Sequence, residues 1–326
     1  DRDRLRRSLK TPGKRNYKTL FSNLTTVCAH EVSKATFMFK DMKDTYYKLT
    51  NAEKKVQRAL REKGLYLDRR DFNIMEVFKG KSEIVRNLVV CLFADGHLLI
   101  EDAPGVGKSL LAQTLAKSVQ GNYKRIQFTP DLMPGDVLGV NLFNFETNEF
   151  RLTKGPIFTD ILLADEINRA PPKTQSALLQ AMNEREVTID GTSHPLGPDF
   201  FVIATQNPIE QHGTYPLPEA QLDRFLFKLI VGFPDRSAEV DILKRSAELP
   251  LGADSGRTEL RKVMDRKTLR AGHELVNSIR LDDTILTYIV DLVRATRSDG
   301  EIQYGASTRA ADAISSAVRA MAALEG

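Results

Sequence analysis

The sequence predicts an α/β fold in which a five-stranded parallel sheet carries a phosphate-binding loop and is followed by a small all-helical region. Three observations lead to this prediction. An apolar segment at 97–101 runs directly into a glycine turn and a helix, four further apolar segments have the length of strands, and the pattern beyond Pro234 is only helical. Strands that alternate with helices are typical of βαβ units, and so of a parallel sheet.

The turn after the first strand, with the sequence DAPGVGKSL at 102–110, is typical of a phosphate-binding loop. Gly105 and Gly107 allow backbone N–H groups to point inward at the start of a helix. Lys108 can reach the outer phosphates, and the Ser109 hydroxyl can bind Mg²⁺. Asp102 replaces the first glycine of the usual pattern, but the later glycines make the turn, so we expect nucleotide binding to survive. The candidate nucleotide-binding residues are Pro104, Gly105, Val106, Gly107, Lys108, Ser109 and Leu110.

Length and composition are those of an ordinary soluble protein. The chain has 326 residues, which at about 150 residues per domain favours two domains. Its two cysteines, Cys28 and Cys91, form no C-x-x-C pair, so they argue against a disulfide framework and for a reducing compartment. No apolar run approaches about 18 residues, and no signal-peptide pattern is visible. We therefore expect a cytoplasmic protein without an integral membrane segment.

The basic charge is concentrated in the N-terminal segment, residues 1–70. This segment holds 19 Lys or Arg against 8 Asp or Glu, whereas residues 71–326 hold 28 against 35. Residues 1–20 have two interpretations: a solvated tail, or an arm that docks on an acidic surface such as nucleic acid or anionic lipid. Residues 24–63 have a helical apolar pattern, and the capping-box sequence Thr50-Asn-Ala-Glu53 favours two helices, packed on this chain or on a partner.

The remaining elements follow from local patterns. A helix at 82–93 is closed by Asp95-Gly96, a helix at 110–119 follows the phosphate loop, and a strand is expected at 124–128. Alternating apolar residues around Glu146-Thr-Asn148 predict a hairpin at 141–152. The uniformly apolar segment 161–164 predicts a central strand covered on both faces.

Two prolines, Pro171 and Pro172, suit the first turn of a helix that runs to about residue 186, and 187–196 has the pattern of a second hairpin. Strands are expected at 200–205 and 225–231. Helices are expected at 237–247, 267–278, 283–297 and 307–324. We accordingly divide the chain into the N-terminal segment 1–70, an α/β core at 71–248 and a helical region at 249–326, which begins with a loop at 249–257.

Polar residues follow two of the predicted central strands. Asp165 and Glu166 follow the strand at 161–164, and Asn207 follows the strand at 200–205. The carboxyl ends of parallel strands face the ligand crevice of an open α/β sheet. In phosphoryl transfer from ATP, one carboxylate helps to hold hydrated Mg²⁺ and another can polarise the attacking water. We assign these roles to Asp165 and Glu166 respectively, and Asn207 could help to orient the water.

The sequence resembles the MoxR group of AAA+ ATPases. The resemblance covers about residues 71–326 and rests on five strings: RIQFTPD at 125–131, LLADEINRAPPKTQ at 162–175, ATQNPIE at 204–210, GTYPLPEAQLDRF at 213–225 and GASTRA at 305–310. It implies a five-stranded AAA+ core with a hairpin inserted at helix 2, which we place at 187–196, and a helical lid. The chain stops soon after 307–324, where family lids continue, which favours an incomplete lid.

The resemblance also implies roles for individual residues and a ring, usually a hexamer, with ATP between subunits. By position, the implied residues are Lys108 and Ser109 of Walker A, Asp165 and Glu166 of Walker B, Asn207 as sensor 1, Arg224 as the arginine finger and Arg309 as sensor 2. Arg224 could instead form a local salt bridge with Asp223 or a neighbouring glutamate. Arg169 could be a further interface arginine or make a local contact. Whether Arg309 acts on its own subunit or on a neighbour stays open.

The function that the resemblance implies is Mg²⁺-dependent ATP hydrolysis coupled to the remodelling or maturation of protein clients, often with a partner that carries a von Willebrand factor A domain. One alternative is a nucleic-acid motor, but the hairpin at 187–196 contains Asp190 and no Lys or Arg to track phosphates. The other is a nucleotide-gated scaffold with little turnover, against which Glu166, Asn207 and Arg224 argue.

Overall fold

The computed structural model describes residues 82–102, 107–207, 213–232, 236–248, 264–300, 302 and 304–325. The expectations for residues 1–70 and for the loop at 249–257 lie outside the described residues. The same is true of Pro104, Gly105 and Val106 in the phosphate loop.

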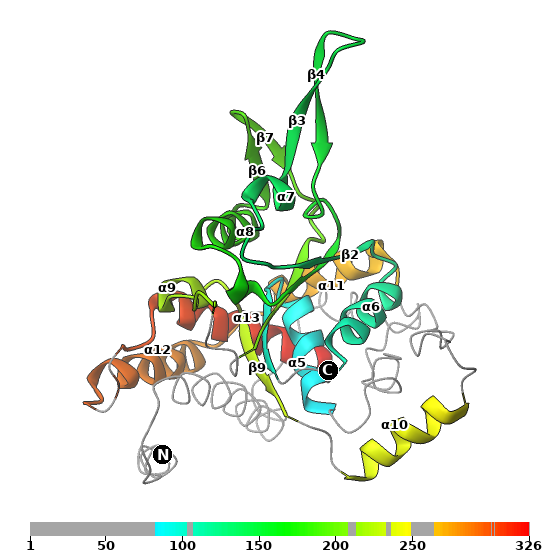
Figure 1. Ribbon diagram of the computed structural model, residues 1–326. Helices are drawn as coiled ribbons and strands as arrows, with labels where there is room; N and C mark the ends of the chain where they lie inside the picture. The colour runs from blue at the N-terminus through cyan, green and yellow to red at the C-terminus, as the bar shows by residue number, and fades with distance from the viewer. Residues whose placement is uncertain are drawn as a thin grey trace.

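The core is a five-stranded sheet with strand order β2-β5-β8-β1-β9 (Figure 1). All four strand pairs are parallel, and the strands are β1 Leu98–Asp102, β2 Tyr123–Gln127, β5 Ile161–Asp165, β8 Phe201–Gln206 and β9 Phe227–Val231. The predicted fold class is confirmed. Each of the five predicted strands is present, with ends that differ from the expected ones by at most two residues.

Successive residues of the central strands pack into two different hydrophobic clusters. On β1, Leu98 and Ile100 belong to one cluster, and Leu99, which points to the opposite face, belongs to the other. The first cluster includes the helices α5 Ser82–Phe93, α6 Lys108–Ser118, α11 Arg266–Ser278 and α13 Thr308–Glu325; the second includes α7 Pro134–Leu138 and α8 Pro172–Glu184. Burial on both faces explains why β5 is apolar along its whole length up to Asp165.

Two hairpins project from the core, both where the sequence predicts them, but the one that we expected to be the helix-2 insert is not (Figure 1). Hairpin β3–β4 is formed by Gly139–Asn144 and Glu149–Lys154, and hairpin β6–β7 by Glu186–Ile189 and Thr192–Pro195. We expected the helix-2 insert at 187–196. Counted from the phosphate loop, however, α7 is the second helix and α8 the third, so the hairpin that adjoins the second helix is β3–β4. The placement at 187–196 was wrong because α7 has only five residues, too few to show helical periodicity.

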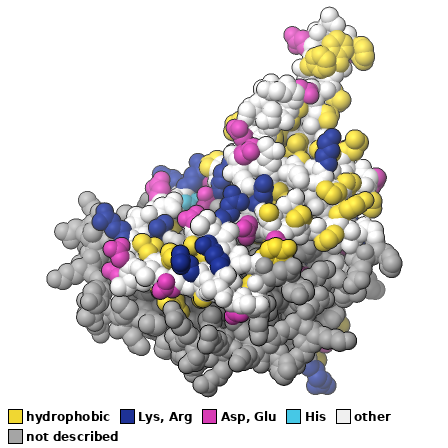
Figure 2. Space-filling view, turned by 90° about the vertical axis from the view of Figure 1, so that its left-hand side faces the viewer, with side chains coloured by type: hydrophobic (Ala, Val, Ile, Leu, Met, Phe, Trp, Pro, Cys, Tyr) yellow, Lys and Arg dark blue, Asp and Glu magenta, His cyan; other side chains and the backbone are white. Residues whose placement is uncertain are grey.

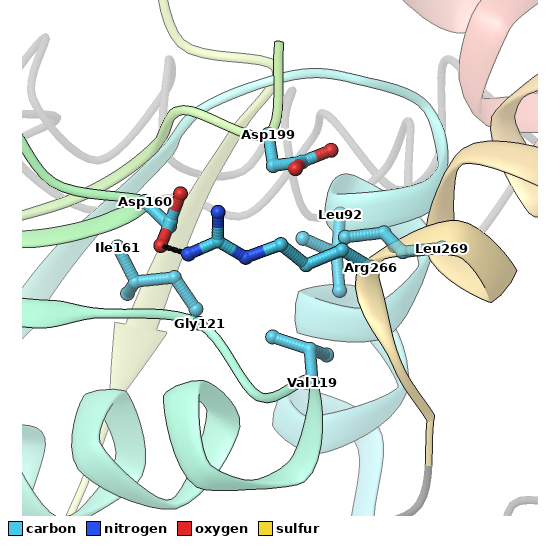
Figure 3. A pocket seen from close by; sticks show the side chains of 8 residues that line it. All are labelled: Leu92, Val119, Gly121, Asp160, Ile161, Asp199, Arg266 and Leu269. Atoms are coloured by element: carbon cyan, nitrogen blue, oxygen red, sulfur yellow. Dashed lines mark hydrogen bonds and ion pairs between the residues drawn. The ribbon is translucent and has the colours of Figure 1, made fainter. Parts of the chain in front are cut away.

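Helices α11 and α13 pack against α5, and α11 is joined by ion pairs to residues that precede β5 and β8. Gly272 of α11 lies against Phe93, so close that a Cβ there would be 2.4 Å from the ring. Figure 3 shows the adjoining small pocket, into which Arg266 projects and pairs with Asp160. Asp160 precedes β5, whereas Asp165 ends it, so this pocket lies at the sheet edge opposite the predicted nucleotide site. We therefore interpret this pocket as part of the structural contact between α11 and the α/β core.

The remaining helices are α9 Glu219–Leu222, α10 Arg236–Glu248 and α12 Asp283–Ser298, with a 3₁₀ turn, η1, at Ile167–Arg169. The four helices expected between 237 and 324 are all present. Helix α9 was not predicted, because its four residues carry too short a pattern. No helix among the described residues is long and apolar enough to cross a membrane.

A buried histidine, His97, makes the stability of the fold depend on pH. Its Nδ1 accepts a hydrogen bond from the Val202 backbone N–H at 3.1 Å, and its Nε2 lies 3.1 Å from the Met182 carbonyl oxygen. The ring is therefore held in the neutral tautomer that carries its proton on Nε2. Burial lowers the pKa of His97 from its ordinary value of 6.5 to about 4.

Because the unfolded chain binds a proton on His97 below about pH 6.5 and the folded chain only near pH 4, stability should fall as the pH falls through this range. We expect the free energy of unfolding, measured with urea, to drop by about 2 kcal/mol between pH 7 and pH 5 from this residue alone. His97→Gln is the control: it should be less stable at pH 7 but show a flatter profile. Equal slopes in the two proteins would contradict the prediction.

Candidate functional site

The candidate site lies at the carboxyl edge of the sheet, where β1, β8 and β5 are consecutive neighbours. Strand β1 leads into the phosphate loop, and α6 begins at Lys108 directly after it. Gly107, the residue before the helix, has φ of 88°, a left-handed conformation that glycine adopts without steric cost. The amino-terminal end of α6, with its backbone N–H groups and the positive end of the helix dipole, therefore lies beside strands whose ends carry polar residues.

Asp165, the last residue of β5, is only 8% exposed and is bound on both carboxylate oxygens. The Thr205 hydroxyl on β8 donates to Oδ1 at 2.6 Å. The Arg125 guanidinium on β2 donates to Oδ2 from Nη2 at 2.6 Å and from Nε at 3.2 Å. The neighbouring strands on both sides thus fix the orientation of this carboxylate, and the half-exposed arginine balances its charge.

Glu166 is held in an uncommon backbone conformation by the same threonine. Its φ of 57° and ψ of 48° are left-handed, which costs a non-glycine residue roughly 1–2 kcal/mol. Its backbone N–H donates to the Thr205 hydroxyl at 2.9 Å, so one hydroxyl joins both carboxylate residues.

The Glu166 carboxylate contacts two further side chains. Oε2 accepts a hydrogen bond from Gln127 Nε2 at 2.6 Å and forms an ion pair with Arg169 Nε at 3.1 Å. Gln127 in turn accepts a hydrogen bond from Arg125 at 2.8 Å. A continuous polar network therefore runs from Asp165 through the two β2 side chains to Glu166. For Arg169, the structure shows the local contact that was one of our two interpretations.

Asn207, directly after β8, is 6% exposed and lies next to the segment that follows Glu166. The backbone carbonyl oxygen of Asn207 accepts a hydrogen bond from Asn168 Nδ2 at 3.4 Å. The Gln175 amide on α8 donates to the carbonyls of Ile167 and Ala170, both at 3.1 Å, and so holds η1 in place. The ends of β5 and β8 are therefore joined by buried polar contacts as well as by strand pairing.

The two predicted arginines, Arg224 and Arg309, lie away from the strand ends. Arg224 lies between α9 and β9, and its Nη1 donates to the Leu179 carbonyl of α8 at 2.7 Å. The Asn183 amide, oriented with its oxygen toward Arg224, accepts further hydrogen bonds from it at 2.8 and 3.3 Å. Arg309 lies in the first turn of α13 with an exposed side chain. The fold of one chain thus brings Asp165, Glu166 and the Asn207 segment together. It places Arg224 against α8 and Arg309 on α13.

Three residues of the polar network had no role in the sequence-based prediction: Thr205, Arg125 and Gln127. These residues are visible as polar side chains in the predicted strands, but their contacts with Asp165 and Glu166 can be inferred only when the order of the strands in the sheet is known. Arg125 and Gln127 are two residues apart on β2, so they share a face, and Gln127 is in register with Asp165. Thr205 could be placed beside Asp165 only once β8 was known to pair with β5.

Comparisons with known proteins agree on one family. Residues 97–227 match the sequence model of the family described as ATPase family associated with various cellular activities (AAA). The chain is 47% identical over 253 residues to an uncharacterized protein, YeaC, of Bacillus subtilis, and the match covers 77% of each chain. It is 39% identical over 269 residues to Chaperone MoxR1 of Mycobacterium tuberculosis, covering 80% of this chain and 70% of that protein.

A solved structure supports the same relationship. A crystal structure of a protein from Cytophaga hutchinsonii, assigned as an ATPase, superposes on this chain with a TM-score of 0.72 at 37% sequence identity. The match covers 82% of this chain and 84% of that one. Both the sheet and the helices around the candidate site therefore lie within a known architecture.

Proposed function

This chain belongs to the MoxR family of AAA+ ATPases, and we propose that it hydrolyses ATP at the carboxyl edge of the sheet, with Glu166 as the residue that activates water. One observation carries the proposal. The hydroxyl of Thr205 accepts a hydrogen bond from the backbone N–H of Glu166 and donates one to the carboxylate of Asp165, so one side chain links the carboxylate of Asp165 to the backbone of Glu166. Asp165 and Glu166, consecutive in the chain and linked in this way, would supply the separate carboxylates that metal binding and water activation need.

The other proposed roles follow from position. The N–H groups of residues 104–110 and the amino-terminal end of α6 would hold the phosphates, and Lys108 would neutralise charge on the outer ones. Asn207 would orient the attacking water. Glu166 would accept the proton of that water as it attacks the γ-phosphate in line. Because the Glu166 carboxylate already contacts Gln127, a change in that contact would alter its orientation toward the water.

The donor chemistry at the site fits Mg²⁺. Ser109 and Asp165 would hold it, since hydroxyl and carboxylate oxygens, together with phosphate oxygens and waters, form the octahedral shell that Mg²⁺ prefers. When bound, Mg²⁺ would neutralise phosphate charge. Arg125 already donates to Oδ2 of Asp165, so this carboxylate has an internal cation as a partner before any metal binds.

We also propose that the active form is a ring, of six subunits as the family usually forms, with ATP between neighbours. Arg224 would act as the arginine finger of the adjacent subunit's site. Within its own chain, its guanidinium donates a hydrogen bond to a backbone carbonyl of α8. Arg309 would sense nucleotide from α13, and residues 249–326 would form the helical lid. The relative named Chaperone MoxR1 supports protein clients as the substrates of remodelling. We also propose that a protein with a von Willebrand factor A domain is a partner of this chain.

The proposal is tested with the purified full chain by phosphate release from ATP, with Mg²⁺ or with EDTA, across the concentrations at which light scattering detects assembly. We expect turnover only with Mg²⁺ and rising specific activity as rings form. Lys108→Ala should abolish it, whereas Lys117→Ala, at the far end of the same helix, should not. A chain that assembles but releases no phosphate with Mg²⁺ would show that the proposed activity is wrong.

A further inference from the structure

Hairpin β3–β4 exposes large hydrophobic side chains at its tip. Phe145 is 89% exposed, Phe150 is 73% exposed and Phe143 is 38% exposed. Figure 1 shows this hairpin reaching farthest from the core, and Figure 2 shows hydrophobic side chains gathered at the tip of the projection. We call these three phenylalanines the aromatic tip.

The aromatic tip is an ordered cluster. The ring centroid of Phe143 lies 5.2 Å from that of Phe145 and 5.1 Å from that of Phe150, both in edge-to-face arrangements. The turn between the strands is closed by Asn144, whose Oδ1 accepts the backbone N–H of Glu146 at 2.8 Å, and by Asn148 in a left-handed conformation. The rings therefore project from a defined turn.

The base of the hairpin is fixed to the core. Gly139 and Gly155 approach so closely that a Cβ on either would lie within 2.7 Å of the other's backbone. The Gly155 N–H donates to the Leu138 carbonyl at 3.2 Å. Asn141 donates to Asp190 at the turn of β6–β7 at 2.9 Å, which braces one hairpin against the other. A ribbon braced in this way holds its tip at a set distance from the sheet.

Folding does not account for the aromatic tip. None of its three rings belongs to either hydrophobic cluster of the core. In the described part of the chain, β3 and β4 pair only with each other, so both outer edges carry unpaired backbone groups. Exposed aromatic groups beside free strand edges are the features by which an extended polypeptide is bound, through apolar contact and strand addition.

The exposed area and the charge of the aromatic tip indicate which kind of partner can bind there. At about 200 Å² for a phenylalanine side chain, the three rings expose roughly 400 Å², well below the ~800 Å² per partner that a stable dimer needs. The surface is convex, and its charges are balanced, with Glu146 and Glu149 opposed by Arg151 and Lys154. It therefore selects neither a folded partner of matching shape nor a nucleic acid, and it suits weak, sequence-tolerant contact.

We propose that the aromatic tip of β3–β4 binds extended apolar segments of non-native proteins and so makes the first contact with a client. This rests on the proposed function in one respect, that the clients are proteins. The contact itself does not require hydrolysis, because the tip belongs to a hairpin separate from the sheet that carries Glu166.

The test compares the full chain with the double variant Phe145→Ser/Phe150→Ser, using a fluorescein-labelled, reduced and carboxymethylated small protein as a permanently unfolded probe. Fluorescence anisotropy without nucleotide should give a dissociation constant at least about tenfold weaker for the variant. The matched control Leu243→Ser removes a comparably exposed apolar side chain from α10 and should bind like the parent. Basal phosphate release and the thermal midpoint should be unchanged in both variants.

Several outcomes would overturn this inference. If the parent releases phosphate but does not bind the unfolded probe, or if the double variant binds it as well as the parent, the tip is not a client site although the ATPase stands. If the double variant instead lowers the oligomeric state in sedimentation, the tip is an interface between copies of the chain. Salt-sensitive DNA binding that the double variant loses would identify a nucleic-acid contact. Absence of phosphate release from the parent would count against the proposed function alone.

Discussion

Glu166→Gln should lower kcat for ATP hydrolysis at least about 100-fold while leaving ATP binding intact. The amide has the shape of the carboxylate and can still accept the hydrogen bond from Gln127, so the site should keep its geometry. It cannot take the proton from the attacking water. The lost catalysis corresponds to about 2.7 kcal/mol of transition-state stabilisation, which is typical for removal of a general base.

The measurement is single-turnover phosphate release together with the affinity for a fluorescent ATP analogue. Glu184→Gln, an exposed glutamate at the end of α8, is the matched control and should behave like the parent. The Glu166→Gln protein should also remain in the ATP-bound assembly, so bound clients should dissociate more slowly. If the rate is unchanged, water activation must be assigned to another group, and the assignment of Glu166 fails even if the chain is an ATPase.

The architecture of the sheet could be predicted from the sequence because its strands are short apolar runs with polar residues at their carboxyl ends. Asp165 and Glu166 after one buried strand and Asn207 after another were enough to place these residues at one edge. The same reasoning could not find α7 or α9, whose four or five residues carry no period. That gap led us to place the insert at 187–196 and to give the more exposed hairpin no role.

The polar network could not be predicted because its contacts cross strands that are distant in sequence. Arg125 and Asp165 are 40 residues apart, and so are Thr205 and Asp165. Which strand lies beside β5 depends on the crossover connections, and local patterns carry no information about register. The chemistry of a strand-end carboxylate is thus visible in the sequence, whereas the groups that orient it depend on strand order.

Thr205→Val should lower kcat roughly 100-fold although Thr205 contacts neither phosphate nor water in the proposed site. Valine has the shape of threonine, so β8 should pack normally, but two hydrogen bonds are lost. The part-buried Glu166 N–H then loses its acceptor, and with it the contact that stabilises a left-handed conformation. A displacement of the carboxylate by about 1 Å is enough for a loss of this size. The KM for ATP should change little, because the phosphate loop is on another strand.

Thr205→Ser separates positioning from general destabilisation. Serine keeps the hydroxyl that donates to Asp165 and accepts from Glu166 but loses the methyl group, so it should recover most of kcat even if the free energy of unfolding falls by about 1 kcal/mol. A merely structural role predicts the reverse order, with valine more active than serine, because valine fills the buried space better. The ratio of kcat between the two variants, at matched ATP saturation, therefore decides whether one hydroxyl on β8 sets the geometry of Asp165, which ends β5, and of Glu166, which follows it.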